Sequence, residues 1–310
     1  MHDELAAYAL DPIGIRRSFD RAAATFDAAA VLHAEVRENL LQRLQLTAFT
    51  PRVVLDLGAG TGHASRALKR RYPGALVIAL DSSPGMLRTA ARRRSWLRRF
   101  ALVCADAEHL PLAQGSVDLI LSNLMLQWCN PDAVFAECRR VLAPQGLLSF
   151  TTLGPDTLRE LRTAWARVDP CSHVHQFIDM HDLGDALVRG GFASPVLDVE
   201  RYILTYSDFT QVAADLKATG AHNISAGRAK GLTGRRKFAA MRTVYETFRQ
   251  DGRLPATYEV VFGQAWAPGE TLQGGDGTTQ RSGEATRRGG ADSTVSLDEI
   301  RRQLRSRRRP

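Results

Sequence analysis

The feature that most constrains this chain is an apolar run that ends in an acid and leads into three glycines. Residues 53–55 predict a buried strand, and Asp56 follows them directly. Residues 58–62 hold three glycines in alternate positions, and residues 63–71 have the apolar spacing of a helix. Glycines in such a turn let the backbone adopt positive φ and approach a ligand closely. The segment therefore predicts a ligand-binding turn at the carboxyl end of a parallel strand.

Strand-like apolar runs alternate with amphipathic segments throughout residues 53–152. Strands that are apolar on both faces and separated by helices predict a parallel sheet covered on both sides. Two further strand-like runs follow among helical segments. The expected strands span residues 53–55, 75–80, 101–104, 117–122, 147–152, 197–204 and 256–262. The sequence thus predicts an α/β fold with a doubly wound, mostly parallel, seven-stranded sheet of the Rossmann-like kind.

Four segments are expected along the chain. Residues 1–50 predict N-terminal helices, and residues 51–153 form the α/β core with the glycine-rich turn. Residues 154–266 complete the core and add helices that we expect to cover the active site. Residues 267–310 are rich in Gly, Ser, Thr and Arg and contain no aromatic residue, so they predict a disordered basic tail.

Acidic residues follow the first three expected strands. Asp56, Asp81 and Asp106 should therefore lie at one edge of the parallel sheet. A dinucleotide-binding turn has G-x-G-x-x-G spacing, whereas the third glycine comes one residue earlier here. A carboxylate at the first strand end would repel a pyrophosphate but suits a cationic ligand with an amino-acid end. The sequence therefore favours S-adenosyl-L-methionine as the cofactor.

Each of these positions has an expected contact on the cofactor. Asp81 would accept hydrogen bonds from both ribose hydroxyls, and Asp106 would accept one from the adenine amino group. Met86 would pack on the adenine face, and Asn123 would face the methionine moiety or the substrate. The residues expected to bind the cofactor are Asp56, Gly58, Gly60, Gly62, Asp81, Ser82, Met86, Asp106, Ala107 and Asn123.

Several short runs across the chain carry a more specific signal. They are Phe19-x-Arg21-Ala22-Ala23, Ser122-Asn123-Leu124, Gln127-Trp128-Cys129, Phe150-Thr151-Thr152-Leu153, Leu216-Lys217 with Gly220-Ala221, Gly227-Arg228, and Thr257-Tyr258. With these runs the sequence resembles the class I S-adenosylmethionine-dependent methyltransferases. In detail it is similar to the malonyl-acyl-carrier-protein O-methyltransferases of biotin synthesis. The glycine-rich turn is common to many methyltransferases, so the runs in the substrate half are more diagnostic.

The resemblance implies methyl transfer to the free carboxylate of a malonyl thioester on acyl carrier protein. It also implies an aromatic cover over the methionine end of the cofactor, where this chain has Phe26 and relatives often have tyrosine. The carboxylate acceptor is already ionised at neutral pH, so the reaction requires no general base. The chain is then expected to orient and desolvate the reactants.

A cationic side chain should orient the acceptor carboxylate. We favour Arg228, because a guanidinium can bind a carboxylate with two parallel hydrogen bonds. Gln127 and Trp128, just past the fourth strand, are expected to line the acyl pocket. The alternatives for the orienting cation are His173, His175 and His222.

The formal net charge is +8 and the pI is about 9.7. Acyl carrier proteins are acidic, so a basic patch would steer their association with the enzyme. Two groups of residues are candidates: Arg92, Arg93, Arg94, Arg98 and Arg99 around Trp96, or Arg235, Arg236 and Lys237. We prefer the second group, within the expected cover helices. Nucleic acid ranks lower as a partner, because the sequence lacks a known binding module.

The chain shows no secretory signal pattern at its start and no apolar run of the roughly 20 residues that a membrane helix requires. Its four cysteines are scattered without metal-ligand spacing. We therefore expect a cytoplasmic protein that binds neither a membrane nor a metal.

Other functions remain open on the same residues. The chain could methylate another small carboxylic acid, or act like the protein-arginine hydroxylase that assists respiratory complex assembly on a related core. Charge alone would also allow a tRNA methyltransferase. A non-catalytic scaffold is disfavoured, because it would not require Asp56, Asp81 and Asp106 together.

Overall fold

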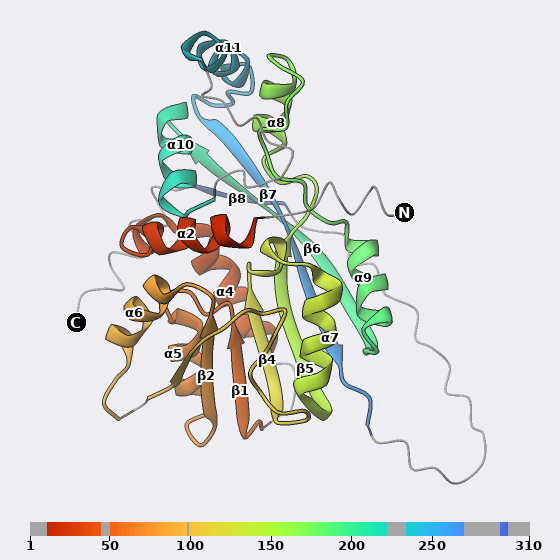
Figure 1. The fold of residues 1–310 in the computed structure, drawn as a ribbon. Helices are drawn as coiled ribbons and strands as arrows, with labels where there is room; N and C mark the ends of the chain where they lie inside the picture. Colours follow the sequence, from red (N-terminus) through yellow and green to blue (C-terminus); the bar gives the residue numbers. More distant parts are fainter. Residues whose placement is uncertain (1–10, 45–49, 98, 222–233, 270–291, 297–310) are drawn as a thin grey trace.

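The computed structural model describes residues 11–44, 50–97, 99–221 and 234–269, and the backbone of Asp292–Ser296. Its centre is one mixed sheet with the strand order β3-β2-β1-β4-β5-β7-β6-β8 (Figure 1). The strands are β1 (Val53–Leu57), β2 (Leu76–Asp81), β3 (Ala101–Cys104), β4 (Val117–Asn123), β5 (Leu142–Leu153), β6 (Ala193–Tyr206), β7 (Leu254–Trp266) and β8 (Asp292–Ser296).

Strands β1 to β5 pair with one another in parallel, as the alternation of strands and helices predicts. β7 lies antiparallel between β5 and β6. The prediction of a doubly wound, mostly parallel sheet is confirmed, with one strand more than the seven expected. Because parallel strands end at the same edge, the carboxyl ends of β1, β2 and β4 lie together.

Alternate residues of the central strands face two helical layers. Leu119 and Leu121 of β4 belong to a buried core with α4 (Val31–Arg43) and α5, whereas Ile120 belongs to a second core with α7 and α9. This alternation buries both faces of the sheet. The flanking helices are α5 (His63–Arg71), α6 (Pro84–Arg93), α7 (Pro131–Val141) and α9 (Met180–Arg189).

Among the described residues, three N-terminal helices precede the sheet, where the sequence predicted helices. They are α2 (Pro12–Ala22), α3 (Phe26–Ala29) and α4 (Val31–Arg43). At the end of α4 the guanidinium of Arg43 binds Asp198 at 2.8 Å and Glu200 at 2.5 Å on β6. It also lies 4.0 Å from the ring centroid of Phe262 on β7. These contacts fix α4 against the antiparallel half of the sheet.

The remaining helices are α8 (Arg159–Ala166), α10 (Phe209–Ala218) and α11 (Arg235–Glu246), with a short 3-10 turn, η2 (Leu126–Trp128). They were expected to cover the active site. α11 packs against α8, and α10 packs against α3 and β6. The hydroxyl of Ser18 on α2 donates to the backbone oxygen of Gly220, just after α10, at 3.0 Å. The C-terminal helices thus form an outer layer, and the N-terminal helices lie next to the glycine-rich turn.

Within the described ranges, no helix is both long enough and apolar enough to cross a membrane.

Strand β8 lies in the segment that composition predicted to be disordered. Its residues pair in parallel with Arg201–Thr205 of β6. β6 would otherwise be an edge strand with unpaired backbone groups, and such an edge accepts a strand through main-chain hydrogen bonds alone. Composition does not report this pairing. The rest of residues 267–310, apart from 267–269, lies outside the described residues.

We expect Gly263→Ala to destabilise the antiparallel half of the sheet. A Cβ at Gly263 would lie 2.3 Å from the Phe150 ring, which is fully buried and packs against Phe135. Overpacking of this kind costs about 1–3 kcal/mol, which thermal unfolding would detect. Gly74→Ala is the control, because a Cβ there meets nothing within 4 Å. Equal stability of the two variants would contradict the packing.

Candidate functional site

The glycine-rich turn folds back over the end of β2. The backbone N–H groups of Gly58 and Ala59 both donate to the oxygen of Leu80 at 2.9 Å. The N–H of Gly60 donates to the carboxylate of Asp81 at 2.8 Å. Gly58 has φ +74°, and a Cβ there would lie 2.3 Å from the Met125 side chain. The turn therefore requires glycine at this position for both conformation and space.

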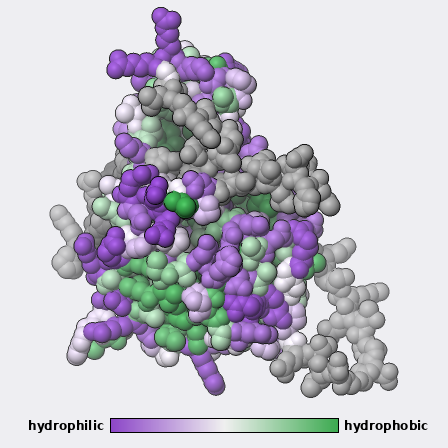
Figure 2. Space-filling view, in the orientation of Figure 1, coloured by the Kyte–Doolittle hydropathy of each residue, from purple (hydrophilic) through white to green (hydrophobic). Residues whose placement is uncertain are grey.

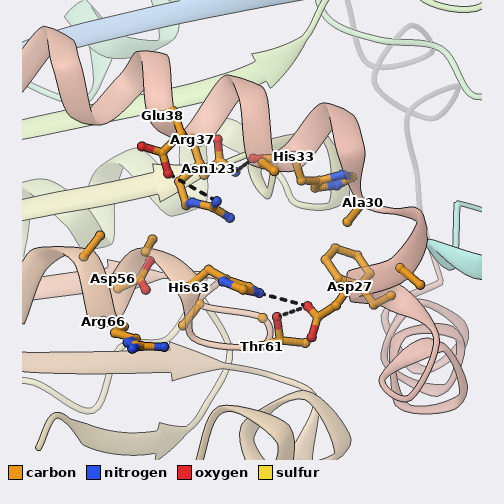
Figure 3. A pocket seen from close by; sticks show the side chains of 18 of the residues that line it. Asp27, Ala30, His33, Arg37, Glu38, Asp56, Thr61, His63, Arg66 and Asn123 are labelled. Atoms are coloured by element: carbon orange, nitrogen blue, oxygen red, sulfur yellow. Dashed lines mark hydrogen bonds and ion pairs between the residues drawn. The ribbon is translucent and has the colours of Figure 1, made fainter. Parts of the chain in front are cut away.

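A cleft of about 730 Å³ lies between this turn and the helices α3 and α4 (Figure 3). Five of the predicted cofactor residues line it: Phe26, Asp56, Gly58, Gly60 and Asn123. Asn123 is held in place, because its Nδ2 donates to the oxygen of His33 and its Oδ1 accepts from Thr151, both at 3.1 Å. These are the residues expected around the methionine end of the cofactor, together with Gly60 of the turn.

The carboxyl group of Asp56 is 1% exposed, at the end of β1. Burial raises its pKa to about 7, and the hydroxyl of Ser65 on α5 donates a short hydrogen bond to it. Nearby Asp81 raises this pKa further, and Arg37 lowers it. A cationic ligand would stabilise the ionised form, so the site favours positive charge beside Asp56.

The other residues predicted to bind the cofactor do not line this cleft: Gly62, Asp81, Ser82, Met86, Asp106 and Ala107. Asp20 of α2 accepts hydrogen bonds from the Ser83 hydroxyl and the Gly85 N–H, both at 2.7 Å, so α2 lies against the start of α6. Met86 is buried, whereas Asp106 is exposed. The sequence predicted their strand ends correctly but could not predict how α2 packs.

Asp81 has both carboxylate oxygens occupied by backbone amides. Besides Gly60, the N–H of Ser83 donates to it at 2.8 Å. A carboxylate has about four acceptor sites, so two remain for the expected ribose hydroxyls. Burial raises the pKa of Asp81, and the two N–H groups oppose that shift.

Gln127 and Trp128 of η2 lie outside the cleft. The side-chain amide of Gln127 has partners within the protein. Its Nε2 donates to the backbone oxygen of Leu124 at 2.7 Å, and its Oε1 accepts from the Thr152 hydroxyl at 3.3 Å. Trp128 packs between Phe19, edge-on at 5.4 Å, and His175, stacked at 5.9 Å between ring centroids. Both side chains therefore hold the loop after β4 in place, and a direct contact with the acyl chain stays a prediction.

The predicted carboxylate-orienting residues have other contacts or lie outside the described residues. Arg228 and His222 are outside them. His173 pairs with Asp169 at 2.8 Å and stacks on Trp165 with 3.8 Å between ring centroids. Burial lowers the pKa of His175, so this ring is neutral at physiological pH.

Asp27 of α3 is a functional candidate that sequence reasoning missed. It accepts a hydrogen bond from the hydroxyl of Thr61 in the glycine-rich turn at 2.6 Å. It also pairs with His63 at 3.3 Å and with Arg93 at the end of α6. Asp27 thus fastens the short helix that carries Phe26 onto the turn. These partners are 34 to 66 residues away in sequence, so no local pattern indicates them.

His33 and Arg37 were also missed. Both project from α4 into the cleft, across from Asp56 (Figure 3). Their spacing of four residues places them on one helix face, a signal that the sequence does contain. Which face of α4 meets the turn is decided only by tertiary packing.

The strand order and the glycine-rich turn define a class I methyltransferase fold. A family model described as a methyltransferase domain matches residues 55–150. The YcgJ protein of Bacillus subtilis superimposes with a TM-score of 0.53 at 16% identity, covering 74% of this chain and 98% of that chain. A candidate methyltransferase of Bacillus halodurans gives 0.52 at 19% identity, covering 74% and 99%.

Relatives in sequence identify the family within the class I methyltransferases. A malonyl-acyl-carrier-protein O-methyltransferase of Laribacter hongkongensis is 56% identical over 84% of this chain and 91% of the relative. Proteins with the same name from Methylovorus sp. and Halorhodospira halophila are 55% and 49% identical, over 84% and 88% of this chain and 91% and 93% of the relatives. The chain belongs to the malonyl-acyl-carrier-protein O-methyltransferase family.

Ionisation of Asp56 is expected to control cofactor affinity. Because its pKa is about 7, the affinity for S-adenosylmethionine should rise between about pH 6 and 7.5, while the cofactor's own ammonium group stays largely charged. Asp56→Asn should bind about tenfold more weakly at the upper pH and lose this dependence, since a hydrogen bond to a charged group contributes about 1.5–3 kcal/mol. Calorimetric titration measures both effects.

The stability of the ligand-free protein should fall as the pH rises, whereas the cofactor affinity should rise. A carboxyl group whose pKa is raised on folding loses its stabilising contribution as pH rises from the unfolded value, 3.8, toward 7.

The control for the binding experiment is Asp132→Asn on α7. This change removes an exposed ion pair with Arg189 and should leave the pH dependence of cofactor affinity unchanged. A wild-type affinity that is flat from about pH 6 to 7.5 would contradict the assignment of Asp56.

Proposed function

We propose that this protein transfers the methyl group of S-adenosyl-L-methionine to the free carboxylate of malonyl-acyl carrier protein, an early step of biotin synthesis. The observation that carries the proposal is the cleft beside the glycine-rich turn, with buried Asp56 in its wall, in a chain 56% identical to a malonyl-acyl-carrier-protein O-methyltransferase. Esterification neutralises the malonyl terminus, so the capped chain can be elongated as an apolar primer.

Bound S-adenosylmethionine supplies a methyl group on a positively charged sulfur. The residues of the chain bind the cofactor and orient the acceptor carboxylate. Asp56 would hold the ammonium of the amino-acid end, and Asn123, fixed by His33 and Thr151, would meet the same end from β4. Phe26, held over the turn by its neighbour Asp27, excludes water. Holding two reactants in line can supply roughly 7–11 kcal/mol in favourable cases. No general base is required, because the acceptor carboxylate is already ionised at neutral pH.

The carrier protein is expected to dock on a basic surface. Side chains of hydrophilic character project over α11 at the upper end of the molecule and around α6 (Figure 2). At the end of α6, Arg92, Arg93 and Arg94 precede Trp96 and Leu97, which are 79% and 80% exposed. We define these five residues as the α6 patch. Exposed apolar side chains beside cations suit an acidic protein partner.

The α6 patch is favoured over the group at the start of α11, which the sequence had suggested first. Arg93 pairs with Asp27, so the patch is continuous with the helix that covers the cleft. In the α11 group, Lys237 pairs with Asp169 at 3.1 Å, and α11 packs against α8 and α10. The α11 group therefore serves as a matched control.

The reaction is tested by incubating the purified protein with malonyl-acyl carrier protein and S-adenosylmethionine. Mass spectrometry of the carrier should show the gain of one methyl ester that depends on the cofactor. Malonyl-CoA and free malonate, in parallel reactions, test whether the carrier is required. A cofactor-dependent ester on the free acid but none on the carrier would point to a small-acid methyltransferase. Methylation of neither would contradict the proposal.

Charge reversal tests the docking surface. The double variant Arg92→Glu with Arg94→Glu should raise the KM for malonyl-acyl carrier protein about tenfold, because steering by exposed charges is lost. The kcat and the affinity for S-adenosylhomocysteine should stay within about twofold, and the difference from wild type should shrink in high salt. Arg235→Glu with Arg236→Glu is the control. An effect on KM from the control pair alone would place the carrier on α11 instead.

A further inference from the structure

The cleft face of α4 carries polar groups that the cofactor contacts above do not use. His33, Arg37 and Glu38 all line the cleft, while Val36 and Leu40 on the same helix are fully buried in the core. The N-terminal half of α4 is tied to β4, because Asn123 donates to the backbone oxygen of His33 at 3.1 Å. The position of this face relative to the strand ends is therefore fixed.

The ring of His33 contains a polar atom that is ready for a ligand. Its Nδ1 is buried and has no hydrogen-bond partner among the described residues. Phe26 packs edge-on against the ring at 5.0 Å between centroids, which holds the ring plane. Burial lowers the pKa of His33 to about 4, so the ring is neutral and can donate one N–H. Buried polar atoms without a partner are rare in folded proteins and call for an explanation.

The guanidinium of Arg37 lies one helical turn further along the same face. Its side chain is 14% exposed, and its ion pair among the described residues is a long contact of 3.4 Å with Glu38, which is 51% exposed. Burial lowers the pKa of Arg37, and Asp56 opposes this shift from across the cleft. A buried guanidinium with one weak partner has donors available for an anion.

The charges across the cleft are therefore arranged as a pair. Asp56 presents negative charge from the end of β1, and Arg37 presents positive charge from α4 (Figure 3). A guanidinium prefers a planar anion that accepts two parallel hydrogen bonds, which a carboxylate does. A neutral imidazole N–H nearby can donate a third.

We infer that His33 and Arg37 form a carboxylate-binding subsite in the cleft. The inference rests on the proposed function, and it deepens that function by naming the residues that hold a carboxylate. Two carboxylates belong to that reaction: the one on the amino-acid end of the cofactor, and the malonyl group that accepts the methyl. The chemistry of recognition is the same for both, and the experiment distinguishes them.

The test substitutes Arg37→Gln and measures two quantities. Calorimetry gives the affinity for S-adenosylhomocysteine and for decarboxylated S-adenosylmethionine, which keeps the amine but lacks the carboxylate. Steady-state kinetics give the KM for malonyl-acyl carrier protein. If the cofactor's carboxylate binds here, affinity for S-adenosylhomocysteine falls about tenfold or more, while that for the decarboxylated compound stays within about twofold. If the malonyl group binds here, the KM rises by a similar factor and neither affinity changes.

Three further variants sharpen the result. Arg37→Lys keeps the charge but not the paired donors, so the affinity or KM that Arg37→Gln impairs should be impaired less. This variant replaces Arg37→Gln in the test if Arg37→Gln does not fold. His33→Phe should weaken the same quantity as Arg37→Gln. Arg189→Gln, which removes an exposed arginine of α9 that does not line the cleft, is the control.

The subsite is refuted if Arg37→Gln leaves all three quantities within about twofold of wild type. It is also refuted if the decarboxylated compound loses as much affinity as S-adenosylhomocysteine, because the effect then does not involve a carboxylate. Wild-type protein that binds S-adenosylhomocysteine but leaves malonyl-acyl carrier protein unmodified would instead contradict the proposed acceptor. The two binding measurements would then decide the subsite alone.

Discussion

The burial of one carboxyl group at the end of β1 is the constraint on which the rest of the site depends. Asp56 is 1% exposed, and this burial raises its pKa to about 7. Taking an ionised carboxylate out of water is costly unless a cation or several donors accompany it. Ser65 supplies one donor. The site therefore favours a positively charged ligand, and the affinity for the cofactor depends on the ionisation of Asp56.

The turn that creates this environment is held by contacts that only glycine permits. The amides of Gly58, Ala59 and Gly60 are directed to the end of β2, and Met125 fills the space beside Gly58. The N-terminal helices then close the other side, fastened by Asp27 to the turn and by Arg43 to β6. The cofactor cleft is thus built from the first strand of the sheet and from helices that precede it in sequence. This arrangement leaves the later helices as an outer layer.

Much of the fold follows from local sequence pattern, because strand and helix periodicity and the turn glycines are local features. The ranges of β3 and α5 agree with prediction to the residue, and the parallel order follows from the alternation of elements. The placement of the N-terminal helices could not be predicted in this way. Asp27 binds Thr61 of the turn, 34 residues away, and His33 and Arg37 reach the cleft only through the tertiary packing of α4.

Part of the candidate site could also be predicted from local sequence pattern. Asp56 and Asn123 follow strands, so their places at the sheet edge could be read from sequence, and both line the cleft. Asp81 ends β2 and Asp106 follows β3, as predicted, whereas the hydrogen bonds of Asp20 that hold α2 against the start of α6 join residues more than 60 apart and leave no local pattern. The pairing of β8 with β6 depends on backbone groups alone, so composition gave no sign of it.

The central claim is that the amino-acid end of S-adenosylmethionine lies in the cleft with its ammonium group beside Asp56. A crystal structure of the protein with S-adenosylhomocysteine tests it most directly. The account predicts the amino nitrogen within hydrogen-bonding distance of the Asp56 carboxylate, about 2.7–3.2 Å, or joined to it by one ordered water. An amino-acid end that points out of the cleft, with Asp56 still bonded only to Ser65, would contradict it.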